Sequence, residues 1–280
     1  LARTVMGVYR NQNKTPVCIA RDREEQRLGE TMTSMLEYNS KINEKKELDA
    51  RMFEEFLISG LAIQKESYGL RGKRQDCWTD NINPNFFFMD GTMNDVRMND
   101  VTIIGELHDI SFGQLASTFA HSNADIQRLQ EIYKNARNRE MLEGYLDTFR
   151  RNTADLVSFL APYNLSLCRV IEIWAKEQRK ALWCHDYLTG DAYIDSYASL
   201  NDIEKENRSR MEDNRMKDMQ GNYLLDESGE IRLQMPVDQV PLIEYEYIIE
   251  NYWYYRFMSP FGDVIEEGES PYQHGEHPYT

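Results

Sequence analysis

A run of alternating large and charged residues near the end of the chain, IEYEYIIENYWYYRF (243–257), places the strongest constraint on the fold. Its odd positions are mostly large aliphatic or aromatic residues, whereas Glu244, Glu246 and Glu250 occupy even positions. Successive side chains of a strand point to opposite faces, so this alternation predicts a half-buried β-strand. We expect the strand to break near Asn251.

Two amphipathic helices and a β-hairpin are predicted upstream. Apolar residues recur every three or four positions in segments 23–39 and 45–59, and Gly60 then provides a stop signal. Segments 60–68 and 74–82 have strand patterns and flank the turn GLRGK, which predicts a hairpin. The two apolar rows are Leu28, Met32, Met35 and Leu36 in the first helix, and Leu48, Met52, Phe56 and Leu57 in the second.

Three further helices are predicted after the strand VTIIGEL. Ser111 can cap the first of them, and Ser122 with Asp125 has the spacing of a capping box at the start of the second. The third begins at Arg139, and we expect Pro162 to end it.

The pattern changes after this proline. Segments 167–177, 180–188 and 191–197 have the composition of strands in a meander, with turns expected at EQR and TGD. A mostly charged stretch follows, EKENRSRMEDNRMKD, whose i,i+4 pairs of opposite charge favour a solvated helix or arm.

Together these patterns predict an α+β fold. We expect N-terminal helices with a mixed sheet in residues 1–161. A β-rich antiparallel region should follow in residues 162–280, with a charged helical insertion at about residues 201–221.

The balance of charge limits the classes of function. The 280 residues include 32 Lys and Arg against 47 Asp and Glu, which gives a formal net charge of −15. Proteins whose main task is to grip phosphates usually carry a basic footprint, so this balance argues against such a task. No apolar run reaches the ~20 residues of a membrane helix, and no signal peptide is apparent. The chain begins at Leu1 and ends at Thr280 just after HGEHPY, so we expect a piece truncated at both ends.

Motifs for catalysis or cofactor binding are missing from the sequence. The four cysteines are widely spaced and form no CxxC pair, and the five histidines form no HExxH motif. Cys184 and His185 are neighbours on a predicted strand, so their side chains should point to opposite faces and cannot act as nucleophile and base. We therefore predict no catalytic, cofactor-binding or metal-binding residues, no cofactor and no enzyme activity.

Two groups of charged residues still require an interpretation. Asp90, Asp95 and Asp100 are five apart, which does not fit the two-residue spacing of an EF-hand loop. They follow or precede Gly and Asn, so we interpret Asp90 and Asp95 as residues that fix a turn. Arg71, Lys73 and Arg74 lie at the tip of the predicted hairpin, where contact with nucleic acid is one interpretation and solubility is the other.

Several motifs also occur in a recognisable order. They are RTVMGVYRNQNKTP, then EEFLISGLAIQKESY, then the long segment 82–119, then CRVIEIWAKE, and finally YYRFMSPFGDVIEEGESPYQHGEHPY. In this order they resemble the portal (head–tail connector) proteins of tailed double-stranded DNA phages, especially the branch of short-tailed phages and prophage-like relatives in Bacteroidetes. The positions that match the family pattern are Asp90, Asp95, Ser111, Phe119, Val170, Glu172 and Trp174.

The resemblance implies a structural subunit of the virion with no catalytic residues. It implies a portal-like fold and a dodecameric ring at one capsid vertex, through which DNA is packaged and ejected. The implied partners are sister subunits, terminase, a capsid or scaffold protein, a tail adaptor and the double-stranded DNA in the channel, with no membrane. Assembly is expected in the cytoplasm of the bacterial host.

Two other functions remain open from the residues alone. One is a nucleic-acid-binding module that uses the basic hairpin tip and the aromatic strand. The other is a metal-dependent phage hydrolase that uses Asp and His residues, although no ligand motif supports it.

Overall fold

The structure is a computed structural model that describes the chain except for residues 1, 12–15, 92–93, 96–98, 153–156 and 228. The described chain divides into two compact units, each with its own core. Unit 1 comprises Leu1–Ala175 and Trp253–Thr280, and unit 2 comprises Lys176–Tyr252. The border predicted between the regions 1–161 and 162–280 falls inside unit 1, and this division into two regions remains a prediction.

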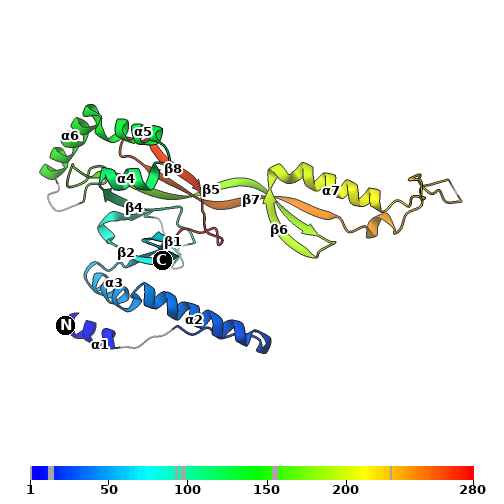
Figure 1. Cartoon of the computed structure of the whole chain (residues 1–280), viewed down its shortest axis with the longest axis horizontal. Helices are drawn as coiled ribbons and strands as arrows, with labels where there is room; N and C mark the ends of the chain where they lie inside the picture. Colours follow the sequence, from blue (N-terminus) through cyan, green and yellow to red (C-terminus); the bar gives the residue numbers. More distant parts are fainter. Residues whose placement is uncertain (1, 12–15, 92–93, 96–98, 153–156, 228) are drawn as a thin grey trace. The chain divides into compact units, whose positions relative to one another are not determined.

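Helices and antiparallel strands both contribute, which confirms the α+β class (Figure 1). The helices are α1 (Ala2–Asn11), α2 (Gln26–Ile42), α3 (Lys45–Ser59), α4 (Phe112–Phe119), α5 (Asn123–Lys134), α6 (Ala136–Asn152) and α7 (Leu200–Asp213). The strands are β1 (Ile63–Arg71), β2 (Arg74–Ile82), β3 (Phe87–Met89), β4 (Ile103–Ile110), β5 (Cys168–Asp186), β6 (Asp191–Ser196), β7 (Ile243–Met258) and β8 (Val264–Glu269). Short 3-10 turns lie at η1 (Arg23–Glu25), η2 (Pro84–Phe86), η3 (Tyr197–Ser199) and η4 (Val237–Gln239).

In the part of the chain that the structure describes, the strands form a two-stranded and a six-stranded sheet. The hairpin β1–β2 is antiparallel, with Gly72 in a left-handed turn at its tip. The larger sheet has the order β3-β4-β5-β7-β8, and β6 pairs with β5 beside this path. β5 and β7 are long strands whose residues belong partly to unit 1 and partly to unit 2.

The described residues of unit 1 form two apolar clusters. Leu115 of α4 and Leu129 of α5 pack against Val170 of β5, so these helices cover one part of the sheet. Ser111 caps α4 as predicted, in a capping box with Gln114, and the predicted capping box of Ser122 and Asp125 starts α5. The second cluster joins the hairpin to the sheet and the C-terminal segment through Ile63, Ile82, Val101, Ile104, Trp174, Trp253 and Tyr279.

Unit 2 is a smaller two-layer arrangement. α7 packs through Ile203 on Leu182 and Cys184 of β5 and on Ile243 of β7. The charged stretch therefore does form a helix, although it ends at Asp213 and irregular bridges follow.

Three predicted boundaries are wrong. The expected turn at EQR is continuous strand within β5, and the expected break near Asn251 is continuous strand within β7. Both errors have one cause: polar residues of the two strands pair across the ladder, as Arg179 does with Glu250 and Gln178 with Asn251. The helix expected to reach Pro162 is not helical at residues 157–160.

Candidate functional site

Among the described residues, a partly buried cluster of ionisable side chains lies in unit 1 around the buried Glu172. It joins Lys65 of β1, Glu106 and His108 of β4, and Glu172 of β5. Glu106 and Glu172 are direct partners in the β4–β5 ladder, and His108 lies two residues along the same face. Two carboxylates placed opposite each other repel, so the arrangement requires positive groups between them.

Lys65 and His108 supply these positive or hydrogen-bonding groups. The Lys65 Nζ atom lies 2.5 Å from Glu172 Oε2 and 3.4 Å from Glu106 Oε2. His108 Nε2 lies 2.7 Å from Glu172 Oε2, and Trp174 Nε1 donates to Glu172 Oε1 at 2.8 Å. The Glu172 side chain is only 2% exposed, so the hydrogen bonds and the positive charge that its carboxylate requires come from inside the protein.

The ionisation of the cluster follows from this geometry. Burial alone would raise the pKa of Glu172, but the hydrogen bond from His108 and the charge of Lys65 hold that pKa at about 2. The carboxylate is therefore ionised near neutral pH, and His108 Nε2 acts as a donor to it. Burial raises the pKa of Glu106 in spite of the positive neighbours. Burial would lower the pKa of Lys65, yet Glu172 and Glu106 raise it overall.

The C-terminal segment closes the cluster from another side. Thr280 and Gln64 exchange two backbone hydrogen bonds of 2.9 Å, and Glu66 N donates to Pro278 O at 2.8 Å. Tyr279 is buried over Lys65, whose Nζ atom lies 5.3 Å from the ring centroid. The Tyr279 hydroxyl is buried without a hydrogen bond of good geometry, although burial and the nearby Glu172 and Glu106 charges raise its pKa.

A metal ion is one chemical possibility for this cluster. One ligand atom each from Glu106, His108 and Glu172 lie within 4.8 Å of one another, and nitrogen and carboxylate oxygen are ligands that divalent cations accept. The Lys65 ammonium, however, already contacts both carboxylates, so a metal ion would have to displace it. In this arrangement the protein provides its own cation.

The sequence patterns do not predict that these four residues lie together. Lys65 and Glu172 are 107 residues apart, and only the matched motif of Val170, Glu172 and Trp174 pointed toward it. These three side chains are all buried on β5. A glutamate between two large apolar residues on the inner face of a strand was the available signal.

The acids between β3 and β4 bind the local backbone. Asp90 Oδ2 accepts hydrogen bonds from Thr102 N at 3.0 Å and from Thr102 Oγ1 at 2.6 Å. Asp100 Oδ2 accepts from the backbone N–H groups of Asn94 and Asp95. Asn99 Nδ2 donates to Asp95 Oδ2 at 2.8 Å. These contacts agree in kind with a turn role for Asp90 and Asp95, which remains a prediction.

The three basic residues at the hairpin tip differ from one another. Arg71 makes a two-pronged ion pair with Asp80, with an Nη1–Oδ1 distance of 2.9 Å, and lies over the Trp78 ring. Lys73 and Arg74 are exposed in the turn and at the first position of β2. Arg71 is thus occupied within the hairpin, and its predicted contact with nucleic acid would have to compete with Asp80.

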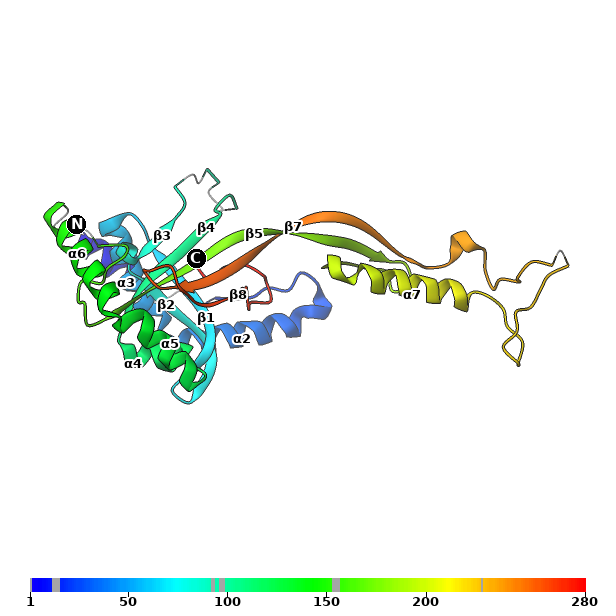
Figure 2. The same ribbon diagram turned by 90° about the horizontal axis from the view of Figure 1, so that it is seen from above.

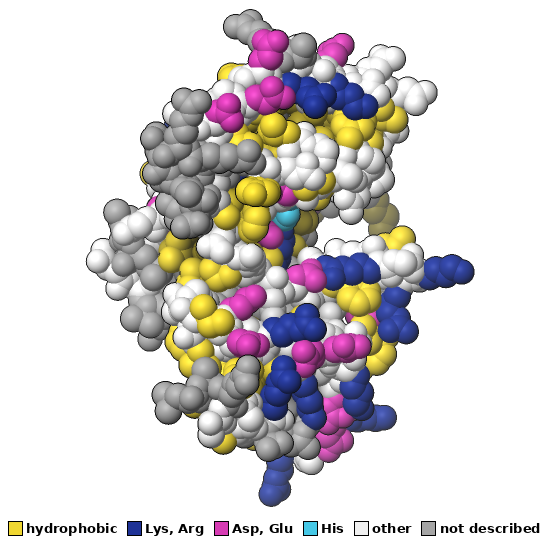
Figure 3. All heavy atoms as spheres, turned by 90° about the vertical axis from the view of Figure 1, so that its left-hand side faces the viewer, with side chains coloured by type: hydrophobic (Ala, Val, Ile, Leu, Met, Phe, Trp, Pro, Cys, Tyr) yellow, Lys and Arg dark blue, Asp and Glu magenta, His cyan; other side chains and the backbone are white. Residues whose placement is uncertain are grey.

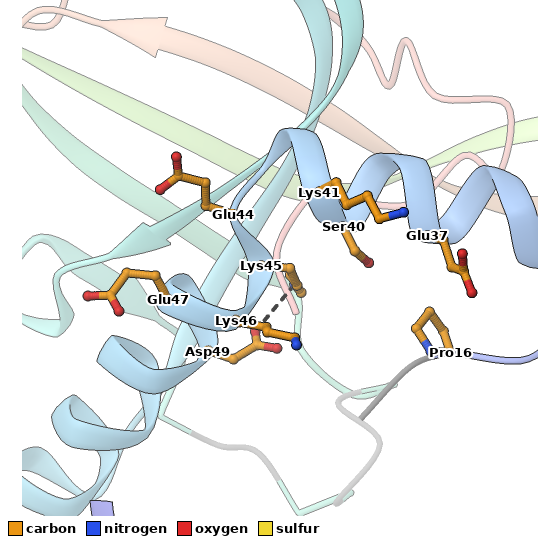
Figure 4. A pocket seen from close by; sticks show the side chains of 9 residues that line it. All are labelled: Pro16, Glu37, Ser40, Lys41, Glu44, Lys45, Lys46, Glu47 and Asp49. Atoms are coloured by element: carbon orange, nitrogen blue, oxygen red, sulfur yellow. Dashed lines mark ion pairs between the residues drawn. The ribbon is translucent and has the colours of Figure 1, made fainter. Parts of the chain in front are cut away.

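A pocket of about 880 Å³ lies between α2 and α3 (Figure 4). Lysines and acids both line it, and Lys45 pairs with Asp49 at 3.7 Å. Over the N-terminal helices, basic and acidic side chains are likewise interspersed on the face in Figure 3. A lining of both signs does not favour a phosphate group. The residues around the pocket are Pro16, Glu37, Ser40, Lys41, Glu44, Lys45, Lys46, Glu47 and Asp49.

Comparison with protein families gives a match over the whole chain. The model of the family described as Phage P22-like portal protein matches residues 1–280. Among curated proteins, none matches the chain. None of the helices that the structure describes has the length and apolarity required to cross a membrane.

Proposed function

The chain belongs to the Phage P22-like portal protein family, and we propose that it forms the rigid body of one subunit in a twelve-membered ring. It is a structural portal subunit of the head–tail connector at the capsid vertex, through which double-stranded DNA is packaged and ejected. Membership implies assembly with further copies and contacts with capsid, terminase and DNA.

The finer points of this role are proposals. The specific partners are sister subunits, terminase, a capsid or scaffold protein, and a tail adaptor, and the ring assembles in the cytoplasm of the bacterial host. The family is a structural one, and we assign this chain no catalytic, cofactor-binding or metal-binding residue. Its net charge of −15 supports a protein that DNA passes without tight binding, because acidic surfaces repel phosphates.

The observation that carries the proposal is the family match over residues 1–280, and the cluster around Glu172 supports a firmly held subunit body. The cluster ties three segments that are distant in sequence: the hairpin at Lys65, the sheet at Glu106 and Glu172, and the C-terminal residues at Tyr279. An ion-pair cluster that links distant segments in this way suits a portal subunit, which must keep its conformation while DNA passes through the ring. A hydrolytic site would require an open position for substrate, whereas these carboxylates are occupied by Lys65 and His108.

The test is the assembly of the full-length protein, measured by light scattering and negative-stain microscopy. We expect twelve-fold rings with a central channel, and weak binding of double-stranded DNA that changes little with salt. A monodisperse monomer or dimer over a wide concentration range would contradict the ring. Tight binding that falls steeply with salt would instead favour the nucleic-acid module.

A further inference from the structure

The apolar row of α2 does not pack into the core of unit 1. Leu28, Met32, Met35 and Leu36 are on one side of the helix, as the sequence predicts, but they are 57%, 48%, 65% and 42% exposed. We call these four side chains the α2 ridge. An amphipathic helix ordinarily buries such a row, so the ridge is an apolar surface that the described residues leave largely exposed.

The reason lies in what the rest of α2 contacts. Near its C-terminal end, Asn39 and Asn43 donate hydrogen bonds to Cys77 O of β2 at 2.9 and 3.0 Å. Its N-terminal half extends away from the hairpin β1–β2 in both views (Figures 1 and 2). The face that rests on β2 at one end is therefore uncovered at the other.

A neighbouring side of the same helix is already occupied. The Gly29 backbone packs so closely on segment 16–20 that a side chain there would meet Cys18 O and Ala20 N at 3.2 Å. Cys18 N donates to Thr33 Oγ1 at 2.9 Å. Small and polar residues of α2 thus take up the local chain, while the large apolar ones point elsewhere.

We propose that the α2 ridge is an interface with a second copy of this chain, the adjacent subunit of the portal ring. This inference rests on the proposed function. In a closed ring each subunit presents two different surfaces, so the ridge should meet a patch other than the α2 ridge of its neighbour.

Charge around the ridge favours a copy of the same chain as its occupant. Two copies that each carry a net charge of −15 repel over most of their surfaces. Between residues 23 and 41, however, Arg23, Arg27 and Lys41 nearly balance Glu24, Glu25, Glu30 and Glu37. An apolar row with a nearly neutral rim is a place where two such chains can approach.

The test replaces the two methionines of the ridge with polar residues of similar size. We expect the double variant Met32→Gln/Met35→Gln of the full-length protein to reach half-assembly only at a protein concentration about tenfold higher or more. Burial of a methionine side chain in the interface is favourable, whereas burial of a glutamine amide does not supply this hydrophobic free energy. Gln matches Met in helix propensity, so helix content should not change. Met219→Gln, a matched change at a fully exposed position in unit 2, should leave assembly unaltered.

A second measurement separates this inference from the ring proposal. A photo-reactive benzoylphenylalanine at position 35 should cross-link to another copy of the chain. Unchanged assembly of the double variant overturns the inference and leaves the ring intact, and cross-linking only to co-expressed terminase or capsid protein also overturns it. Absence of rings in the wild type with copy-to-copy cross-links would contradict the ring and support the ridge, whereas absence of both would contradict both.

Discussion

Units 1 and 2 each contain an ion pair that few waters can reach, but the two pairs are built differently. In unit 1, Glu172 is bound to Lys65 from a segment 107 residues away, with Glu106 close by as a second acid. In unit 2, Arg210 of α7 binds Asp186 of β5 in a two-pronged pair only 24 residues apart, with Nη1–Oδ1 and Nη2–Oδ2 distances of 2.7 and 2.8 Å.

The two pairs differ in which segments of the chain they hold together. The cluster in unit 1 forms only when the hairpin, the sheet and the C-terminal segment have met, so it depends on long-range folding. The pair in unit 2 links α7 to the end of β5, with β6 between them in the sequence, and Arg210 also donates to Pro241 O. Loss of the first pair leaves two neighbouring acids, Glu172 and Glu106, without Lys65, whereas loss of the second leaves the single buried acid Asp186.

The largest effect is expected from Lys65→Ala. This change leaves Glu172 and Glu106 buried without their cation, which should lower the free energy of unfolding of unit 1 by about 3–5 kcal/mol. Chemical denaturation combined with hydrogen exchange would locate the loss. Lys73→Ala, in the exposed hairpin turn, is the control and should change the stability little. Equal stability of both variants would contradict a structural role for the cluster.

A steric change next to the same cluster comes second. A side chain at Gly105 would place its Cβ 2.2 Å from Glu172 O and 2.4 Å from Phe88 Cζ, so β4 and β5 would have to separate. We expect Gly105→Ala to cost about 3 kcal/mol or somewhat more. Gly144→Ala in α6, where nothing lies within 4 Å, should instead be neutral or stabilise by up to about 1 kcal/mol. Thermal unfolding of the two variants in parallel gives the comparison.

Arg210→Ala tests the other side of the comparison. It removes two charge-assisted hydrogen bonds from Asp186, and we expect a loss of about 1.5–3 kcal/mol. Hydrogen exchange should show faster opening of α7 and of the strand residues it covers, while the amides of β4 remain protected. Equal loss of protection in both units would show that they unfold together, which would weaken the distinction drawn above.

The pH dependence of stability should also differ between Glu172 and its neighbour. The folded pKa of Glu172 is held at about 2, so its contribution is fully present above the ordinary glutamate pKa and is lost as the pH falls toward 2. The pKa of Glu106 is raised, so its protonation opposes that loss. We expect Glu172→Gln to flatten the fall in stability of unit 1 below pH 4.5, measured by urea denaturation across the pH range. A fall as steep as that of the wild type would assign acid sensitivity to other groups.

Local signals in the sequence predicted a good part of the fold. The capping residues Ser111 and Ser122 mark the helix starts, and the turn at Gly72 fixes the hairpin, because these features depend on a few neighbouring residues. Periodicity also placed the α2 ridge on one side of its helix correctly. It could not say whether another segment covers that side, since a pattern records amphipathicity and not the partner.

Long-range pairing accounts for most of what the sequence did not reveal. In the sequence the polar residues near Gln178 and Asn251 resemble interruptions, because the partners that they pair with lie on another strand. The sequence does not predict the cluster around Glu172 for the same reason, since Lys65 and His108 lie 107 and 64 residues from Glu172 in the sequence. Only the position of Glu172 between Val170 and Trp174 hinted at a buried carboxylate.

The smallest effect is expected from Asp90→Ala/Asp95→Ala. Asp90 holds the backbone and side chain of Thr102 next to β4, so its removal opens the loop and leaves the strands paired. We expect a loss of about 1–2 kcal/mol in the free energy of unfolding, because hydrogen bonds to a charged acceptor are removed where water can replace them. Asp76→Ala on β2 is a matched control, since Asp76 is half-buried like Asp90 and accepts one local hydrogen bond, from Cys77 N. If the double variant equals this control in both denaturation and ring assembly, Asp90 and Asp95 do not fix the connection, and the motif they match has another role.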